Sequence, residues 1–131
     1  MLFYTFSSQD ERRKFGGSYF IEMQYCKFAK GTEIQKLIPV NAIEHWKNDS
    51  LYIYGDHDNE FMKFYSDIFT GGIYSNGESG VVDLYGINYY SRECSHIIIE
   101  KIKKTKPLDY QLLLNWLDKP NEYTGFYILG L

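Results

Sequence analysis

The sequence predicts a single α+β domain of 131 residues, in which about three helices pack against a mixed or mostly antiparallel sheet. Three observations support this fold class. Residues 60–70 carry apolar side chains at helical spacing, Asn76-Gly77 has the form of a tight hairpin turn, and segments typical of strands and of helices alternate irregularly. A chain of this length suits one domain with a core of its own.

The hairpin is predicted near residues 73–85. Asn76 and Gly77 tolerate the positive φ angles of a tight turn, and apolar or aromatic runs flank them on both sides. We therefore predict paired strands over Ile73–Ser75 and Val81–Tyr85. Three further residues after Gly77 lengthen the connection, so the register of the pair stays open.

The first half of the chain is predicted to hold four short strands separated by turn residues: Leu2–Phe6, Phe20–Phe28, Glu33–Ile38 and Leu51–Tyr54. Across Ile21–Tyr25, apolar residues alternate with polar ones, which is the period of a half-buried strand. A helix over Glu22–Phe28 is the competing interpretation. Gln9–Lys14 forms either a turn of helix or a loop. Pro39 opens a short segment, PVNAIEHW, and suits a first helical turn.

The clearest helical element is predicted over Glu60–Thr70, after a loop at residues 55–59. Its apolar residues recur at i, i+3, i+4, i+7 and i+8 and predict one buried face: Phe61, Phe64, Tyr65, Ile68 and Phe69. Glu60 suits the positive end of the helix dipole. Gly71 suits the left-handed residue with which helices often end.

After the hairpin, Gly86–Tyr90 is predicted to stay extended and Ser91 to cap a second helix. The apolar positions of that helix are Cys94, Ile97, Ile98 and Ile102. Three consecutive isoleucines also fit a strand, so a strand is the alternative to this helix. In either case Pro107 ends the element.

A third helix is predicted over Tyr110–Lys119, with Asp109 as its cap and Pro120 as its stop. Its apolar side holds Leu113, Trp116 and Leu117. The closing segment, Gly125–Leu131, is apolar throughout and predicts a central strand, because such a strand is buried on both faces.

The formal net charge of −3 hides an asymmetry along the chain. The span 49–83 has a charge of −6, because Lys63 is its only base and it holds seven acids: Asp49, Asp56, Asp58, Glu60, Asp67, Glu78 and Asp83. The rest of the chain carries 13 basic and 10 acidic residues. An acidic middle indicates a basic partner or a cation and disfavours nucleic acid, although a merely solvated acidic surface is the alternative.

Cysteine usage and the amino terminus predict the compartment. Cys26 and Cys94 are favoured as free thiols over a disulfide, because the amino terminus lacks the basic-then-apolar order of a secretory signal. No apolar run approaches the roughly 20 residues that a membrane span requires. We therefore expect a cytoplasmic protein without a membrane segment.

The best metal candidate is Asp56-His57-Asp58, followed by Glu60. Adjacent residues rarely converge on one ion without a further ligand, so a polar turn with helix-capping aspartates is the simpler interpretation. None of the three histidines lies in a nucleophile or zinc motif, and the glycines form no phosphate loop. The basic run Lys101–Lys106 fits a solvated helix end. We predict no catalytic residue, no cofactor and no metal.

Tyrosines and carboxylates gather around the hairpin and predict a partner-binding surface. Rings supply contact area, and carboxylates pair with the Arg or Lys of a basic partner. Strand alternation would place Tyr85 and Asp83 on one face and Leu84 on the other. Core packing of the same tyrosines is the alternative. The predicted partner-binding residues are Asp56, Asp58, Glu60, Tyr74, Glu78, Asp83, Tyr85 and Tyr89.

Three segments give the chain a resemblance to a known group of proteins: GVVDLYGINYYS (Gly80–Ser91), PLDYQLLLNWL (Pro107–Leu117) and GFYILGL at the end. Together with the small, acidic, aromatic-rich character of the chain, they resemble the bacterial immunity proteins of contact-dependent growth inhibition and related polymorphic toxin systems. The resemblance implies a cytoplasmic, non-catalytic protein that binds a toxin domain tightly and occludes its active site or a nearby surface. Such toxins are often nucleases with basic clefts, which would suit the acidic span 49–83.

Two other functions stay open. One is a small metal-dependent hydrolase that uses His57 with Asp56, Asp58 and Glu60, and the other is an adaptor domain without a toxin. An upstream reading frame encoding the end of a very large secreted protein would favour immunity. The oligomeric state is open between a monomer and a weak dimer.

Overall fold

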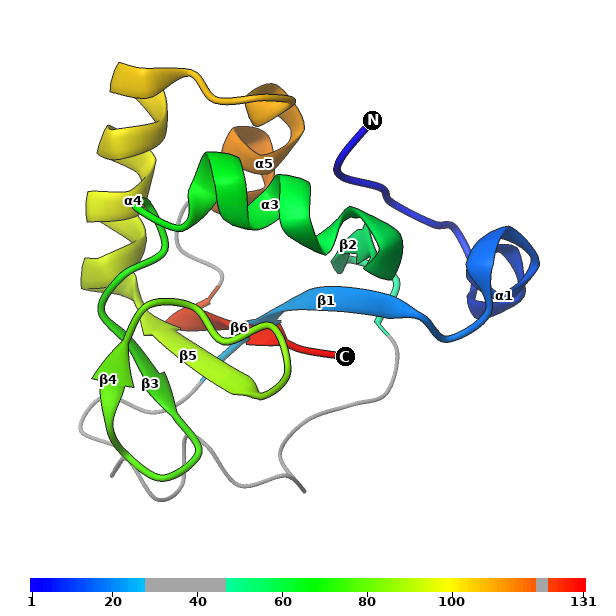
Figure 1. The fold of residues 1–131 in the computed structure, drawn as a ribbon, viewed down its shortest axis with the longest axis horizontal. Coiled ribbons are helices and arrows are strands. Elements are labelled where there is room, and N and C mark those ends of the chain that lie inside the picture. Colours follow the sequence, from blue (N-terminus) through cyan, green and yellow to red (C-terminus); the bar gives the residue numbers. More distant parts are fainter. Residues whose placement is uncertain (28–46, 120–122) are drawn as a thin grey trace.

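The computed structural model describes residues 1–27, 47–119 and 123–131 (Figure 1). These residues form an α+β fold of four α-helices and a six-stranded antiparallel sheet, as predicted. The helices are α1 (Gln9–Gly16), α3 (Asp58–Tyr65), α4 (Arg92–Thr105) and α5 (Tyr110–Leu117), with a 3₁₀ turn η2 (Gly55–His57). The strands are β1 (Phe20–Cys26), β2 (Leu51–Tyr54), β3 (Gly72–Tyr74), β4 (Ser79–Gly80), β5 (Ile87–Ser91) and β6 (Gly125–Leu129). The strand predicted over Glu33–Ile38 and the segment from Pro39 lie outside the described residues.

The sheet has the strand order β2-β1-β6-β5-β3-β4, and every pair is antiparallel. The last strand of the chain is therefore at the centre, between β1 and β5, which confirms the prediction made for the apolar closing segment. Its register sets Met23 beside Ile128 and Tyr90 beside Phe126. Among the described residues, no helix is both long enough and apolar enough to cross a membrane.

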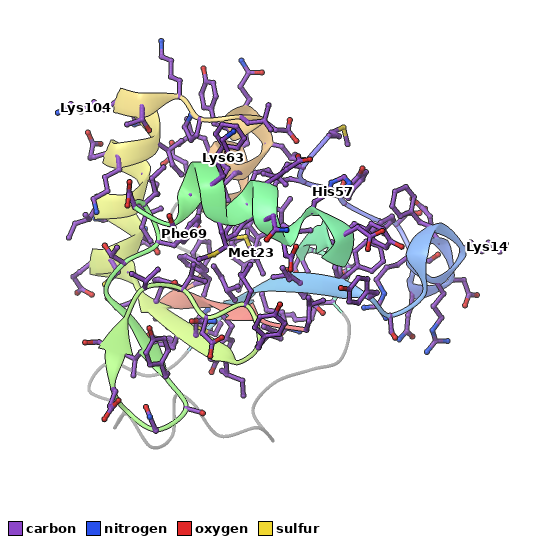
Figure 2. All side chains as sticks on the ribbon, in the orientation of Figure 1. Lys14, Met23, His57, Lys63, Phe69 and Lys104 are labelled. Atoms are coloured by element: carbon purple, nitrogen blue, oxygen red, sulfur yellow. The ribbon has the colours of Figure 1, made fainter. Side chains whose placement is uncertain are left out.

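Helices α3, α4 and α5 lie on one face of the sheet, and the main core fills the layer between them (Figure 1). Ile21, Met23 and Tyr25 of β1 contribute to this core, which confirms that they share one face, but the strand is buried on both faces and not half-buried as predicted. Phe69 and Met23 lie in that layer, whereas Lys104 lies at the outer end of α4 (Figure 2). The intervening Glu22 and Gln24 are on the other face and are buried as well.

A smaller aromatic cluster joins the amino-terminal segment and α1 to the start of the sheet: Phe6, Phe20 and Tyr52, with Tyr4 and Tyr54 packed against them. The predicted strand over Leu2–Phe6 is wrong, because only Tyr4 forms a bridge, with Tyr52. The amides of Leu2 and Phe3 instead donate to the carboxylate of Asp109, at 2.8 and 3.0 Å. The same contact corrects the role of Asp109, whose side chain makes no capping bond to α5.

Helix α3 is shorter than predicted and faces slightly differently. It ends at Tyr65, and Ile68 and Phe69 are buried in the turns that follow it, where both amides donate to the carbonyl of Tyr65. Phe61 and Tyr65 are fully buried, as predicted, but Phe64 is 39% exposed and is not a core residue. Gly71 has the predicted positive φ, 80°.

The predicted hairpin exists, but its second strand differs from the prediction. β3 pairs with β4 across a turn in which Gly77 has a φ of 86°. Residues 81–85 form no strand, because β5 occupies the other edge of β3 and the amide of Val82 donates to the carbonyl of Phe69. In α4, Ser91 accepts from the amide of Cys94 as predicted, but Ile97 is 58% exposed and Ile99 is buried in its place. Both cysteines are free, and Cys26 is buried.

Candidate partner-binding surface

Three segments distant in sequence bring tyrosines and carboxylates together beside the start of β1. We call this the acidic–aromatic surface, and its residues are Tyr19, Tyr54, Asp56, Asp58 and Tyr85. Tyr19 precedes β1, the two aspartates belong to η2 and the first turn of α3, and Tyr85 follows β4. His57, labelled in Figure 2, marks the place where η2 meets α3.

The pairing of β1 with β2 positions Tyr19 against the turn that carries the aspartates. Phe20 pairs with Tyr54, so Tyr19 falls opposite Gly55, whose amide donates to the Tyr19 carbonyl at 2.8 Å. The Tyr19 ring then lies over Gly55, where an added Cβ would be 2.4 Å from a ring carbon. Because a glycine stands there, the ring can lie directly beside Asp56.

The electrostatics of Tyr19 reflect this crowding of negative groups. Partial burial raises the pKa of the Tyr19 hydroxyl, and the carboxylates of Asp58 and Asp56 raise it further. Tyr85 and Tyr54 add smaller effects in the same direction. The surface is therefore negative, and the Tyr19 phenol is neutral at pH 7, as that of an ordinary tyrosine is. A neutral phenol between two carboxylates offers a hydrogen-bond donor, an acceptor and an aromatic face.

Contacts between neighbouring aromatic rings hold part of the surface in place. Tyr54 makes edge contacts with Tyr19 at 5.9 Å between ring centroids, with Phe15 at 6.0 Å and with His57 at 6.1 Å. Phe15 and Tyr19 are about half exposed. Edge-to-face aromatic contacts of this kind hold rings in fixed orientations, so the surface is built largely before any partner arrives.

Tyr85 is the most exposed of these aromatics, at 73%, and its loop is well anchored. Its amide donates to the carboxylate of Asp83 at 2.9 Å, and the Asn88 side chain exchanges two hydrogen bonds with the Asp83 backbone. The amide of Leu131 adds a bond to the carbonyl of Leu84. Asp83, which was predicted to bind a partner, is exposed and also orders the Tyr85 loop.

Two further predicted residues, Tyr74 and Glu78, lie apart from the aspartates of the acidic–aromatic surface. They are on the β3–β4 hairpin, four strands away from β2, a separation of about 19 Å at the usual spacing between strands. The Tyr74 hydroxyl donates to the carbonyl of Val81. Of the residues predicted around the hairpin, Tyr85 is therefore near Asp56 and Asp58, whereas Tyr74 and Glu78 are not.

Tyr89 is buried, so the predicted partner contact at this residue is wrong. It is 5% exposed and packs with Cys26 and Tyr127, 5.7 Å from the Tyr127 ring. Burial raises the pKa of Tyr89 to about 12. Glu60, in contrast, is exposed on the first turn of α3, two residues after Asp58.

The sequence did not single out Tyr19 or Phe15, because both lie far along the chain from the aspartates. Tyr54 is only two residues before Asp56, but it was assigned to a strand and given no role in binding. The position of Tyr19 could be inferred only from the pairing of the two strands. Once residues 20–26 and 51–54 are aligned antiparallel, Tyr19 faces the turn after Tyr54. Among residues 1–27, 47–119 and 123–131, no three His, Cys, Asp or Glu side chains are grouped to hold a metal. The Asp56-His57-Asp58 run thus gives the hydrolase alternative no metal centre in that part of the chain.

Comparisons with protein-family models, with curated proteins and with solved structures found no match. The protein is therefore described by its structure alone: it is an α+β domain with an acidic, tyrosine-bearing surface at one end of its central sheet.

Proposed function

We propose that the acidic–aromatic surface binds a basic protein, and that the partner is a toxin domain that this protein neutralises as an immunity protein. The observation that carries the proposal is the meeting of Asp56 and Asp58 with the exposed rings of Tyr19 and Tyr85. The inhibitor would cover the active-site cleft or a neighbouring surface of the toxin, without a reaction of its own.

The chemistry of the surface suits this task. Carboxylates steer a basic partner during encounter and raise the association rate. Tyrosines that become buried in the interface slow dissociation. Tyrosine supplies large contact area with few rotatable bonds, so ordering it on binding costs little entropy. A solvated acidic face would have no use for half-exposed rings held in fixed positions by Tyr54 and Gly55.

The choice of a toxin as the partner rests on the resemblance of Gly80–Ser91, Pro107–Leu117 and the closing segment to immunity proteins. The first of these segments carries Tyr85 and the loop that holds it. A nuclease toxin has a basic substrate cleft, which would complement Asp56 and Asp58. An adaptor without a toxin is the second candidate, and it would use the same surface on another basic protein.

The test is co-purification with the product of the neighbouring gene, followed by binding kinetics. Asp56→Asn/Asp58→Asn should lower the association rate and weaken its dependence on salt. Tyr85→Ala should chiefly speed dissociation and cost about 2 kcal/mol if Tyr85 is an anchor. The matched control is Asp67→Asn/Glu100→Gln, which removes the same charge from exposed positions elsewhere.

Equal effects of the two charge-neutral double variants would show that only net charge matters and would remove the surface from the proposal. Unchanged rates in all variants, with the fold intact, would place the interface elsewhere. A specific complex that leaves the toxin's activity untouched would favour the adaptor function.

A further inference from the structure

A second site lies at the far end of β1 and has the opposite charge. A cavity of about 170 Å³ opens there, and we call it the lysine pocket. It is lined by Tyr25, Cys26, Lys27, Lys47, Asp49, Lys119 and Tyr123. Tyr19 immediately precedes the seven residues of β1 and Cys26 ends them, so the pocket is about 20 Å from the acidic–aromatic surface.

The charges in this pocket are unbalanced. Among the residues that the structure describes, three lysines and one carboxylate line it, a formal excess of +2. In the part of the chain that the structure describes, the only ion pair is between Lys103 and Glu100 on α4, so none of the pocket ammonium groups is neutralised there. Ammonium groups gathered around one cavity repel one another until an anion enters.

One residue, Tyr25, holds two of the lysines in place. The Lys47 ammonium donates to the Tyr25 carbonyl at 3.3 Å, and the Lys119 ammonium lies over the Tyr25 ring, 5.4 Å from its centroid. The ring itself is fixed by stacking on Trp116 at 3.9 Å and by a hydrogen bond from its hydroxyl to the Trp116 carbonyl. Each ammonium has three donors, and the carbonyl takes only one from Lys47. The remaining donors are therefore available to a ligand at a fixed place.

From this geometry we infer that the lysine pocket binds a phosphate group, either as the free ion or on a small phosphate ester. A phosphate carries more than one negative charge near neutral pH and accepts several hydrogen bonds, which matches several ammonium donors around one small cavity. The cavity has room for one phosphate group and part of an attached group. The aromatic side chains of Tyr25 and Tyr123 border the site and offer an apolar contact to such a group.

The site is independent of the proposed immunity function, since it uses other residues at the other end of the sheet. Its test is calorimetric titration of the whole protein with inorganic phosphate and with adenosine 5′-monophosphate, against sodium chloride at equal ionic strength. We expect one saturable site. Lys47→Gln and Lys119→Gln should each weaken phosphate binding roughly tenfold, as loss of a charge-assisted hydrogen bond predicts.

Two controls make the result specific. Lys14→Gln removes the same charge from α1, beyond the opposite end of β1, and should leave phosphate binding unchanged (Figure 2). Asp49→Asn removes the one carboxylate among the described residues that line the pocket and should tighten binding several-fold, a gain that a damaged fold would not produce. Tighter binding of the monophosphate ester than of the free ion would identify an ester as the ligand, and equal binding would identify the phosphate group alone.

The inference fails if phosphate shows no saturable binding beyond that of chloride. It also fails if Lys14→Gln weakens binding as much as Lys47→Gln does, or if Asp49→Asn gives no gain. The thermal midpoint of each variant is measured alongside, so that loss of binding is assigned only to folded protein.

Discussion

Replacing Phe61 by alanine should cost about 4 kcal/mol of folding free energy, within the range of about 3–5 kcal/mol for a buried phenylalanine. Phe61 is fully buried, and its ring contacts three other rings: Phe3 at 6.3 Å, Tyr65 at 5.3 Å and Phe69 at 5.5 Å. The cavity left by alanine would lie under α3, where rigid neighbours can close it only in part. For a chain of 131 residues, about 4 kcal/mol corresponds to a fall of about 15 °C in the unfolding midpoint.

The matched control replaces a phenylalanine three residues further along the same helix. Phe64→Ala removes the same side chain, but Phe64 is 39% exposed and has the Lys63 ammonium over its ring at 5.4 Å. We expect a cost of about 1 kcal/mol or less, in the usual range for a surface position. Urea unfolding gives both values, provided that the slope of free energy against denaturant is the same for the variants. Costs that agree within about 1 kcal/mol would refute the orientation of α3 described above.

Three further predictions concern the site and the second face of the sheet. Gly55→Ala should displace the Tyr19 ring from its contact with Tyr54, because the new methyl group would be 2.4 Å from a ring carbon, and it should therefore weaken partner binding; an unchanged affinity would separate Tyr19 from the interface. Burial raises the pKa of the Glu22 carboxyl above its usual 4.5, so its stabilising contribution is full at low pH and is lost as pH rises through the raised value. The stability of Glu22→Gln relative to the native protein should therefore increase above pH 4.5, measured by urea unfolding across pH; a flat difference would contradict this. Burial also raises the pKa of the Cys26 thiol to about 12, so a thiol reagent should label Cys94 in the folded protein and Cys26 only on unfolding.

Features that depend on neighbours along the chain could be predicted from the sequence. Ser91 caps α4 through an amide three residues away, and Gly77 turns the hairpin with its own φ angle. Asp109 looked equally like a cap, yet its carboxylate binds amides more than 100 residues distant. A local pattern shows that a side chain can cap a helix, but a competing partner from elsewhere decides whether it does.

Burial of whole faces could not be predicted in the same way. Tyr89 and Tyr90 lie on opposite faces of β5, yet both are buried, so neither ring is exposed. Residues 81–85 have strand composition, but β5 already occupies the position beside β3. Of the candidate site, the aspartates and Tyr85 could be named from composition, whereas Tyr19 required the register of β1 with β2.

The bridge between Tyr4 and Tyr52 has a consequence for self-association. Edge strands with unpaired amides are templates on which another chain can add a strand, and natural sheets protect them. On the outer side of β2, Tyr4 exchanges two hydrogen bonds of 2.8 Å with Tyr52, and Asp109 fastens the two residues before it. Deleting residues 1–6 would uncover this edge and would also remove the Phe3 ring from the buried rings of Phe61 and Tyr65. In the shortened chain β2 would then be an unpaired edge strand and could pair with a strand of a second chain, whereas in the native protein Tyr4 protects this edge.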